Sequence, residues 1–311
     1  MKNRTLSMAF AVLAPALVAP TAFGQAPATP PPDVQIVTTE LAPGIYMLVG
    51  RGGNVGLTVG VDGAAIIDDQ FDDMAPKIRA AVARLSASPV KFVINTHLHG
   101  DHTGGNDAFG KAGAVIIAQE NVRKRLSTPS VNPTSNQPIA ARAREALPVV
   151  TFADSAALHF NDDDLEFRYL PNAHTETDIF IRFRKANIVH MGDMFTAGFP
   201  FIDGNTGGTF NGLIKAHEAV LATIDDQTKV IRGHGPLGNK AELQAYHDML
   251  VVVRDRIAKL VKAGKSQDEV VTARPTKEFE EKYGGANFNA AQWIGRAYVD
   301  QQIALKKKPR T

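Results

Sequence analysis

Short apolar runs bounded by turn residues occupy the first part of the folded chain. Four of them, at residues 34–39, 44–49, 55–61 and 64–68, are rich in β-branched and aromatic side chains and are separated by Pro-Gly, Gly-Gly and Asp-Gly pairs. Runs of this kind with tight turns between them predict a meander of antiparallel strands.

The period of the apolar positions then changes. Ile78, Ala81, Val82 and Leu85 recur at the spacing of one helix face, which predicts an amphipathic helix over residues 75–87 that lies on the meander. Strands and helices then follow a second time. We predict strands at 91–95, 114–118, 149–152, 156–160, 165–170, 179–184, 188–191 and 230–231, helices at 121–126 and 210–223, and a loop at 127–140. Two sheets packed face to face, each covered outside by helices, would bury both sets of apolar faces.

Helical periodicity dominates from residue 241 to the end of the chain. The apolar stripe consists of Leu243, Tyr246, Leu250, Val253, Ile257 and Leu260. We predict that residues 241–311 form helices packed on or beside a domain of residues 34–240, because packing on the chain's own core explains such a stripe more simply than a partner helix does.

The first residues have the pattern of an export signal. Lys2 and Arg4 precede an apolar stretch at 8–18, and residues 22–24 form a small-x-small cleavage pattern, so we predict a signal peptide at 1–24 and a Pro-rich linker at 25–33. Loss of the two basic residues would change the formal net charge from +2 to zero. This predicts a periplasmic or secreted protein with no stable membrane span after cleavage and no basic surface for nucleic acid.

Three histidines and one aspartate stand within six positions, directly after the apolar run 92–94. They are His97, His99, Asp101 and His102, with Gly100 between the pairs. Alternate residues of an extended chain point the same way, so His97 and His99 can converge on one ion, while a turn at Gly100 directs the other two toward a second position. Glycine is expected there because the turn needs dihedral angles that other residues resist. Since the chain has no cysteine, any metal must be held by nitrogen and oxygen.

Three further candidate ligands follow predicted strands. His174 comes after the strand that ends at Leu170, Asp193 after the strand 188–191, and His234 between two glycines after the strand 230–231. A polar group can leave a sheet at these places without burying an unpaired dipole.

With these residues the chain resembles the metallo-β-lactamase superfamily over about residues 34–240. The resemblance implies an α/β fold, a four-layer αββα sandwich of two mixed β-sheets, with the metals at one edge. It implies that His97, His99 and His174 hold a first metal, that Asp101, His102 and His234 hold a second, and that Asp193 bridges the two. Asp68 would accept hydrogen bonds that orient the histidine loop, the alternative being an ordinary turn carboxylate at a strand end. The remaining histidines are expected to be ordinary core or surface residues; they are His159, His190, His217 and His247.

Seven nitrogen and oxygen ligands suit two Zn²⁺ ions best, with iron or manganese conceivable because carboxylates are included. Two such ions would lower the pKa of a shared water, and the resulting hydroxide would attack a carbonyl while Asp101 or a metal-bound water handles the proton. Phe71 and the segment 195–202 would place an apolar wall beside the metals, which favours a small ester, lactone or lactam over a phosphodiester. The predicted function is that of a metal-dependent hydrolase cleaving a carbonyl C–O, C–S or C–N bond.

Three other functions stay open. A dedicated periplasmic β-lactamase is one, although lactam-cleaving members of the resembled family typically have Cys or Ser at the position of Asp193. An iron-dependent redox enzyme of the same fold is the second. A non-catalytic metal-binding protein is the third, and it predicts a missing ligand. The natural substrate and the oligomeric state are not predicted from the sequence.

Overall fold

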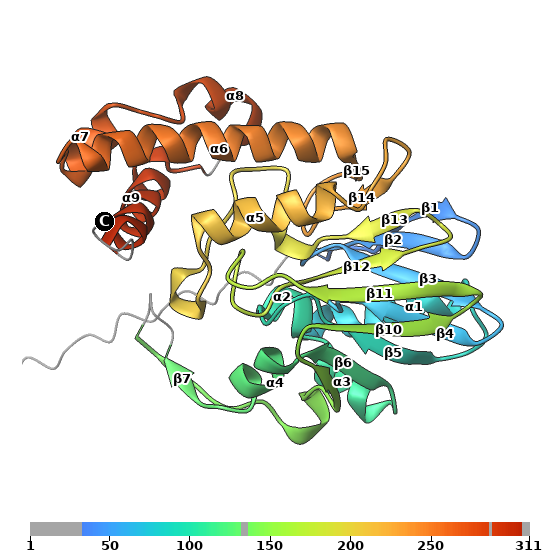
Figure 1. Ribbon diagram of the computed structural model, residues 1–311. Coiled ribbons are helices and arrows are strands. Elements are labelled where there is room, and N and C mark those ends of the chain that lie inside the picture. Colours follow the sequence, from blue (N-terminus) through green and yellow to red (C-terminus); the bar gives the residue numbers. More distant parts are fainter. Residues whose placement is uncertain (1–32, 132–135, 286–287, 307–311) are drawn as a thin grey trace, which may run out of the picture. The chain divides into compact units, whose positions relative to one another are not determined.

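The computed structural model describes residues 33–131, 136–285 and 288–306 (Figure 1). Residues from Val34 onward form one compact unit. The predicted signal peptide, residues 1–24, and the predicted linker up to residue 32 lie outside the described residues. None of the described helices is long and apolar enough to cross a membrane.

The first sheet has seven strands in the order β1-β2-β3-β4-β5-β6-β9. Their bounds are β1 Val37–Ala42, β2 Ile45–Val49, β3 Val55–Gly60, β4 Gly63–Ile67, β5 Val90–Ile94, β6 Val115–Gln119 and β9 Val150–Phe152. The pairs from β1 to β4 are antiparallel, which confirms the predicted meander. The pairs from β4 to β9 are parallel, so the sheet is mixed.

The second sheet has six strands in the order β10-β11-β12-β13-β14-β15. Their bounds are β10 Ser155–Phe160, β11 Asp163–Tyr169, β12 Ile179–Phe183, β13 Ile188–His190, β14 Lys229–Ile231 and β15 Gly238–Asn239. Its pairs are antiparallel except β13 with β14, which is parallel.

Alternating side chains divide the strands between two kinds of core. Ile67 of β4 packs between the sheets with residues of the second sheet such as Phe167, whereas its neighbour Ile66 packs outward against Ile78. In the second sheet, Ile188 likewise points inward. This period of two gives each sheet two buried faces, so the αββα sandwich predicted from the sequence is the fold.

Helices cover both outer faces (Figure 1). On the first sheet lie η1 Asp72–Met74, α1 Ala75–Ala83, α3 Asn106–Lys111, α4 Glu120–Leu126 and η2 Arg144–Ala146. On the second lie α5 Phe210–Leu221 and α6 Lys240–Lys262, which share a core with Val189 and Val230. The remaining helices are α2 Gly100–Thr103, η3 Gly192–Met194, η4 Gly204–Thr206, α7 Gln267–Thr272, η5 Lys277–Phe279, α8 Glu280–Tyr283 and α9 Ala290–Lys306.

The predicted apolar stripe of the C-terminal region packs within this unit. Tyr246 and Leu250 of α6 are fully buried in one core with Leu213 of α5 and Ile294 of α9. That placement confirms the prediction that the stripe serves the chain's own core. The predicted loop at 127–140 contains an exposed hairpin of β7 Ser130–Val131 and β8 Pro138–Ile139, whose two-residue strands are too short to show a period.

Candidate metal centre

The histidine cluster lies where β5 ends at one edge of the sandwich. His97 lies in a bend three residues after the strand, and His99, which is extended, is the N-cap of the short helix α2, which begins at Gly100. The predicted turn at Gly100 is therefore wrong, because the residue is helical. The prediction that this turn needs dihedral angles available only to glycine is wrong for the same reason. An added Cβ there would meet only the Arg142 side chain, at 3.7 Å.

Close packing requires a glycine at position 104, four residues after Gly100. A Cβ on Gly104 would lie 2.6 Å from the carbonyl oxygen of Gly100 and 2.7 Å from that of Gln70. Gly104 N donates to this Gln70 oxygen at 2.7 Å. The segment after β4 can therefore touch the helix that carries Asp101 and His102 only because residue 104 has no side chain.

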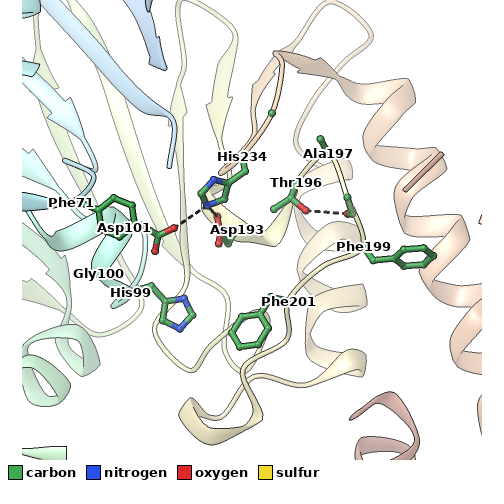
Figure 2. Close-up of a pocket in the computed structure, with 12 residues that line it drawn as sticks. Phe71, His99, Gly100, Asp101, Asp193, Thr196, Ala197, Phe199, Phe201 and His234 are labelled. Carbon is green, nitrogen blue, oxygen red and sulfur yellow. Dashed lines mark hydrogen bonds and ion pairs between the residues drawn. The ribbon is translucent and has the colours of Figure 1, made fainter. Parts of the chain in front are cut away.

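All seven candidate ligands meet at one place, although they come from separate elements. Two groups form, one of His97, His99, His174 and Asp193, the other of Asp101, His102, Asp193 and His234. Within each group, one ligand atom from every residue lies within 4.8 Å of the others, and Asp193 belongs to both. Figure 2 shows Asp101, Asp193 and His234 facing one another, with His99 directed toward the same cavity.

Three atoms at this meeting point have no hydrogen-bond partner among the described residues. They are Nε2 of His97, Nε2 of His102 and Oδ1 of Asp193, and all three are buried. His102 Nε2 and Asp193 Oδ1 lie 3.2 Å apart but are not aligned as a hydrogen bond. Burying a polar atom without a partner is costly, whereas the same atoms are the natural ligands of a cation. The residues present therefore fit a metal centre.

In four of the five rings, the other nitrogen contacts a group outside the two ligand sets. The pairs are His97 Nδ1 with Thr96 Oγ1 at 2.9 Å, His99 Nε2 with Asp203 Oδ2 at 3.1 Å, His102 Nδ1 with Asp68 Oδ2 at 2.7 Å, and His174 Nδ1 with the Phe201 carbonyl oxygen. A partner on one ring nitrogen fixes the orientation of the ring and leaves the other nitrogen for a ligand bond.

The buried carboxylate of Asp68 makes hydrogen bonds with the histidine loop, as expected from the sequence. Its Oδ1 accepts a hydrogen bond from Thr96 N at 2.7 Å, and its Oδ2 accepts from Thr96 Oγ1, also at 2.7 Å, beside the contact with His102. Asp68 is fully buried and has a φ of 62°. Three contacts with the histidine loop favour the orienting role over the alternative of an ordinary turn carboxylate.

The electrostatics of the centre favour positive charge. Burial by itself would lower the pKa of His102, but the carboxylates of Asp193 and Asp68 raise that pKa well above its ordinary value. Burial also opposes protonation of His234, yet the neighbouring carboxylates of Asp101 and Asp193 raise its pKa to about 9. Burial lowers the pKa of His174 to about 4, so this ring is neutral and ready to act as a ligand.

A pocket of about 680 Å³ opens on the two groups. His99, Asp101, Asp193 and His234 line its polar side, and Phe71, Phe199 and Phe201 line its apolar side (Figure 2). The apolar wall predicted from residue 71 and the segment 195–202 is therefore present. Phe195 itself takes no part in this wall, since its ring is buried beside Tyr246.

Sequence reasoning missed the residues that hold the loops in place. Asp203 contacts His99 across 104 positions, and Asn54 Nδ2 donates to the carbonyl oxygens of Arg232 and Gly235 at 2.9 and 2.8 Å, on either side of His234. No spacing or period marks either residue. The four histidines set aside belong to neither group among the described residues: His159 pairs with Asp164, His190 with the Asn54 carbonyl, His217 with the Met194 carbonyl and His247 with Asp248.

Comparisons with known proteins agree with this geometry. A sequence model of the metallo-beta-lactamase superfamily matches residues 48–234. Among solved structures, a metallo-beta-lactamase from Pontibacter korlensis is similar, with a TM-score of 0.57 and 17% identity over 70% of this chain and 99% of that one. The DIM-1 metallo-beta-lactamase is similar with a TM-score of 0.55 and 16% identity over the same shares. No curated protein matches the chain.

Proposed function

The chain belongs to the metallo-beta-lactamase superfamily, and from this premise we propose that it is a metal-dependent hydrolase that cleaves a carbonyl C–O, C–S or C–N bond of a small organic substrate. Its substrates would be esters, thioesters, lactones or lactams. The observation that carries the proposal is that Asp193 belongs to both ligand groups, beside a pocket large enough for a small molecule.

Each group would hold one ion, and the donor set of imidazole nitrogens and carboxylate oxygens suits zinc best. When bound, such a pair of ions supplies Lewis acidity and lowers the pKa of a water molecule toward neutrality. Asp193 reaches both groups and fixes their separation. The imidazoles of His97, His99 and His174 are oriented by partners outside the centre, so the site is formed before substrate arrives.

Asp101 is placed to handle the proton. Its carboxylate is partly exposed to the pocket, and Oδ2 lies 3.1 Å from His234 Nε2. Burial would raise the pKa of Asp101, but the hydrogen bond with His234 and the nearby His102 lower it, so the group is ionised at neutral pH. An ionised carboxylate at the pocket wall can accept a proton from the attacking water and pass it to the leaving group.

The test is hydrolysis by the purified protein with its metal content measured. Lactams, lactones, thioesters and phosphodiesters would be assayed with and without a chelator, and the expected result is hydrolysis of a carbonyl substrate that the chelator abolishes and Zn²⁺ restores. His174→Ala and Asp193→Ala should lose metal and activity together, while His159→Ala, an exposed histidine, should lose neither.

Two outcomes would reject the proposal. One is full hydrolysis by the metal-free protein or by Asp193→Ala. The other is a resident iron with oxygen uptake, which would favour the redox alternative. Selective turnover of lactams within the panel would identify the dedicated β-lactamase.

A further inference from the structure

A second cavity adjoins the metal pocket. It measures about 380 Å³ and shares Gly198, Phe199 and Phe201 with the pocket that opens on the metal groups. Its remaining walls come from the C-terminal region and include Phe288, Trp293 and Arg296. The two cavities therefore lie next to each other along the segment 198–201.

The shared wall is held by the C-terminal helix. Trp293 Nε1 of α9 donates to the Pro200 carbonyl oxygen at 2.8 Å, and the ring of Phe199 stacks on that of Phe288 at 4.4 Å between centroids. The second cavity is thus preformed, which limits the ordering cost of binding a ligand there.

Arg296 brings a positive charge to this cavity and is exposed. Its guanidinium carbon lies 5.1 Å from the centroid of the Phe201 ring, and no salt bridge is found between it and an acidic side chain of residues 33–131, 136–285 and 288–306. Other arginines of the C-terminal region differ in this respect, since Arg254 pairs with Asp255 and Arg256 with Glu278.

We propose that this second cavity is a subsite for a carboxylate at the far end of the substrate, and that Arg296 is the residue that selects it. The proposal rests on the proposed hydrolase function and narrows its substrates to carbonyl compounds that also carry a carboxylate. A guanidinium binds a carboxylate through two parallel hydrogen bonds. Arg296 is the one cation among the described residues that line this cavity, and the aromatic side chains around it suit an apolar chain that ends in a carboxylate better than a free phosphate.

The position of Phe201 sets the expected spacing within the substrate. Its ring centroid lies 6.0 Å from the ring of His99 and 6.0 Å from that of His174, and the same ring lies beneath Arg296. The scissile carbonyl at the metal groups and the carboxylate at Arg296 would therefore be separated by a spacer that crosses one aromatic ring. An apolar spacer suits this path, since Phe199 also lines it.

The kinetic test uses nitrophenyl monoesters of adipic, pimelic and suberic acid, each compared with the same ester whose free carboxylate is capped by methyl. The wild-type protein should prefer the free acids, with the preference depending on chain length. In Arg296→Gln the ratio of kcat/KM for acid over capped ester should fall by about tenfold to a hundredfold, mainly through KM. Arg296→Lys should fall between the two, and Arg254→Gln should keep the wild-type ratio.

A binding test separates this proposal from the hydrolase function. Trp293 is the single tryptophan of the chain and lines the second cavity, so its fluorescence reports what binds there. Phenylacetate should change this fluorescence more strongly than the neutral phenylacetamide, and Arg296→Gln, but not Arg254→Gln, should remove the difference. An unchanged acid-to-capped ratio together with an Arg296-independent fluorescence response would overturn the subsite while the hydrolase stands. A response that depends on Arg296, in a metal-loaded protein that hydrolyses no ester, thioester, lactone or lactam, would support an anion site and reject the hydrolase.

Discussion

Asp68 and His102 meet in the interior with 2.7 Å between Oδ2 and Nδ1, and both side chains are fully buried. The same carboxylate holds the backbone and hydroxyl of Thr96. One side chain at the end of β4 therefore contacts a ring of one ligand group and the loop that carries His97 and His99 of the other group.

Replacing Asp68 with Asn should weaken metal binding by the group of Asp101, His102, Asp193 and His234. The amide cannot accept from the imidazole and from Thr96 as the carboxylate does, so the ring of His102 loses its orientation. We expect affinity for one of two bound ions to fall by about 10- to 100-fold. Competition with a chromogenic chelator measures this. Asp164→Asn, which removes the exposed partner of His159, is the matched control and should bind as the wild type does.

Replacing Asp203 with Asn should weaken the other group. Burial would raise the pKa of Asp203, but hydrogen bonds, first among them the one with His99, lower it to about 2, so a full negative charge faces the His99 ring. Loss of that charge should reduce the affinity of the group of His97, His99, His174 and Asp193 by about 10- to 100-fold. The two variants should therefore affect different steps of a two-step zinc titration. Weakening of the same step by both would contradict this assignment.

Gly53→Ala should disrupt the centre, whereas Gly100→Ala should be tolerated. A Cβ on Gly53 would lie 2.2 Å from Cε1 of the buried His102 ring, and that ring has no room to move without losing Asp68. A Cβ on Gly100 meets nothing nearer than 3.7 Å. We expect metal content and hydrolysis to fall at least about tenfold in the first variant, on the scale of a lost orienting contact. Equal losses in both variants would mean that the loop requires glycine for its backbone conformation.

Stability should decrease in mildly acidic solution because of His217. This ring is fully buried, and burial lowers its pKa from 6.5 to about 4. The unfolded chain takes up the proton first as the pH falls below 6.5, so the stabilising contribution is complete above that pH and is lost toward pH 4. The loss should approach about 3 kcal/mol for this group.

Urea unfolding from neutral pH to about pH 4 measures that loss by comparison with His217→Gln. Glutamine can still donate to the Met194 carbonyl but takes up no proton, so its free energy of unfolding should depend less steeply on pH. His159→Gln, at an exposed histidine, should keep nearly the wild-type slope. Parallel curves for His217→Gln and the wild type would contradict the prediction.

The spacing of apolar residues along the chain predicts most of its strands and helices. Ile66 and Ile67 pack on opposite faces of β4, as the period of a strand requires, and the α6 stripe is buried along one helix face. The candidate ligands can also be recognised from the sequence, because four of them follow a strand within a few residues. His97, Asp193 and His234 stand three residues after a strand, and His174 stands five residues after one. Their chemistry and their place at strand ends are properties of short segments.

The supporting residues have no such local signal. Phe201 and Asp203 lie in a segment without a period, and they reach His174 and His99 only because that segment folds back over the sheet edge. The helical start at Gly100 likewise has no local signal, and the helix contacts a distant segment, since Gly104 N donates to the Gln70 carbonyl oxygen at 2.7 Å.

By itself, the sequence predicted most of the strands and helices, two sheets packed face to face and seven candidate metal ligands. The elements follow from backbone periods, and the four-layer sandwich with its set of ligands follows from the resemblance to a known superfamily. Only the tertiary structure decided which nitrogen of each imidazole faces inward, which carboxylate orients it, and that Arg296 stands beside the metal pocket. These depend on how four layers pack against one another, and a contact between residues a hundred positions apart leaves no period in the chain that makes it.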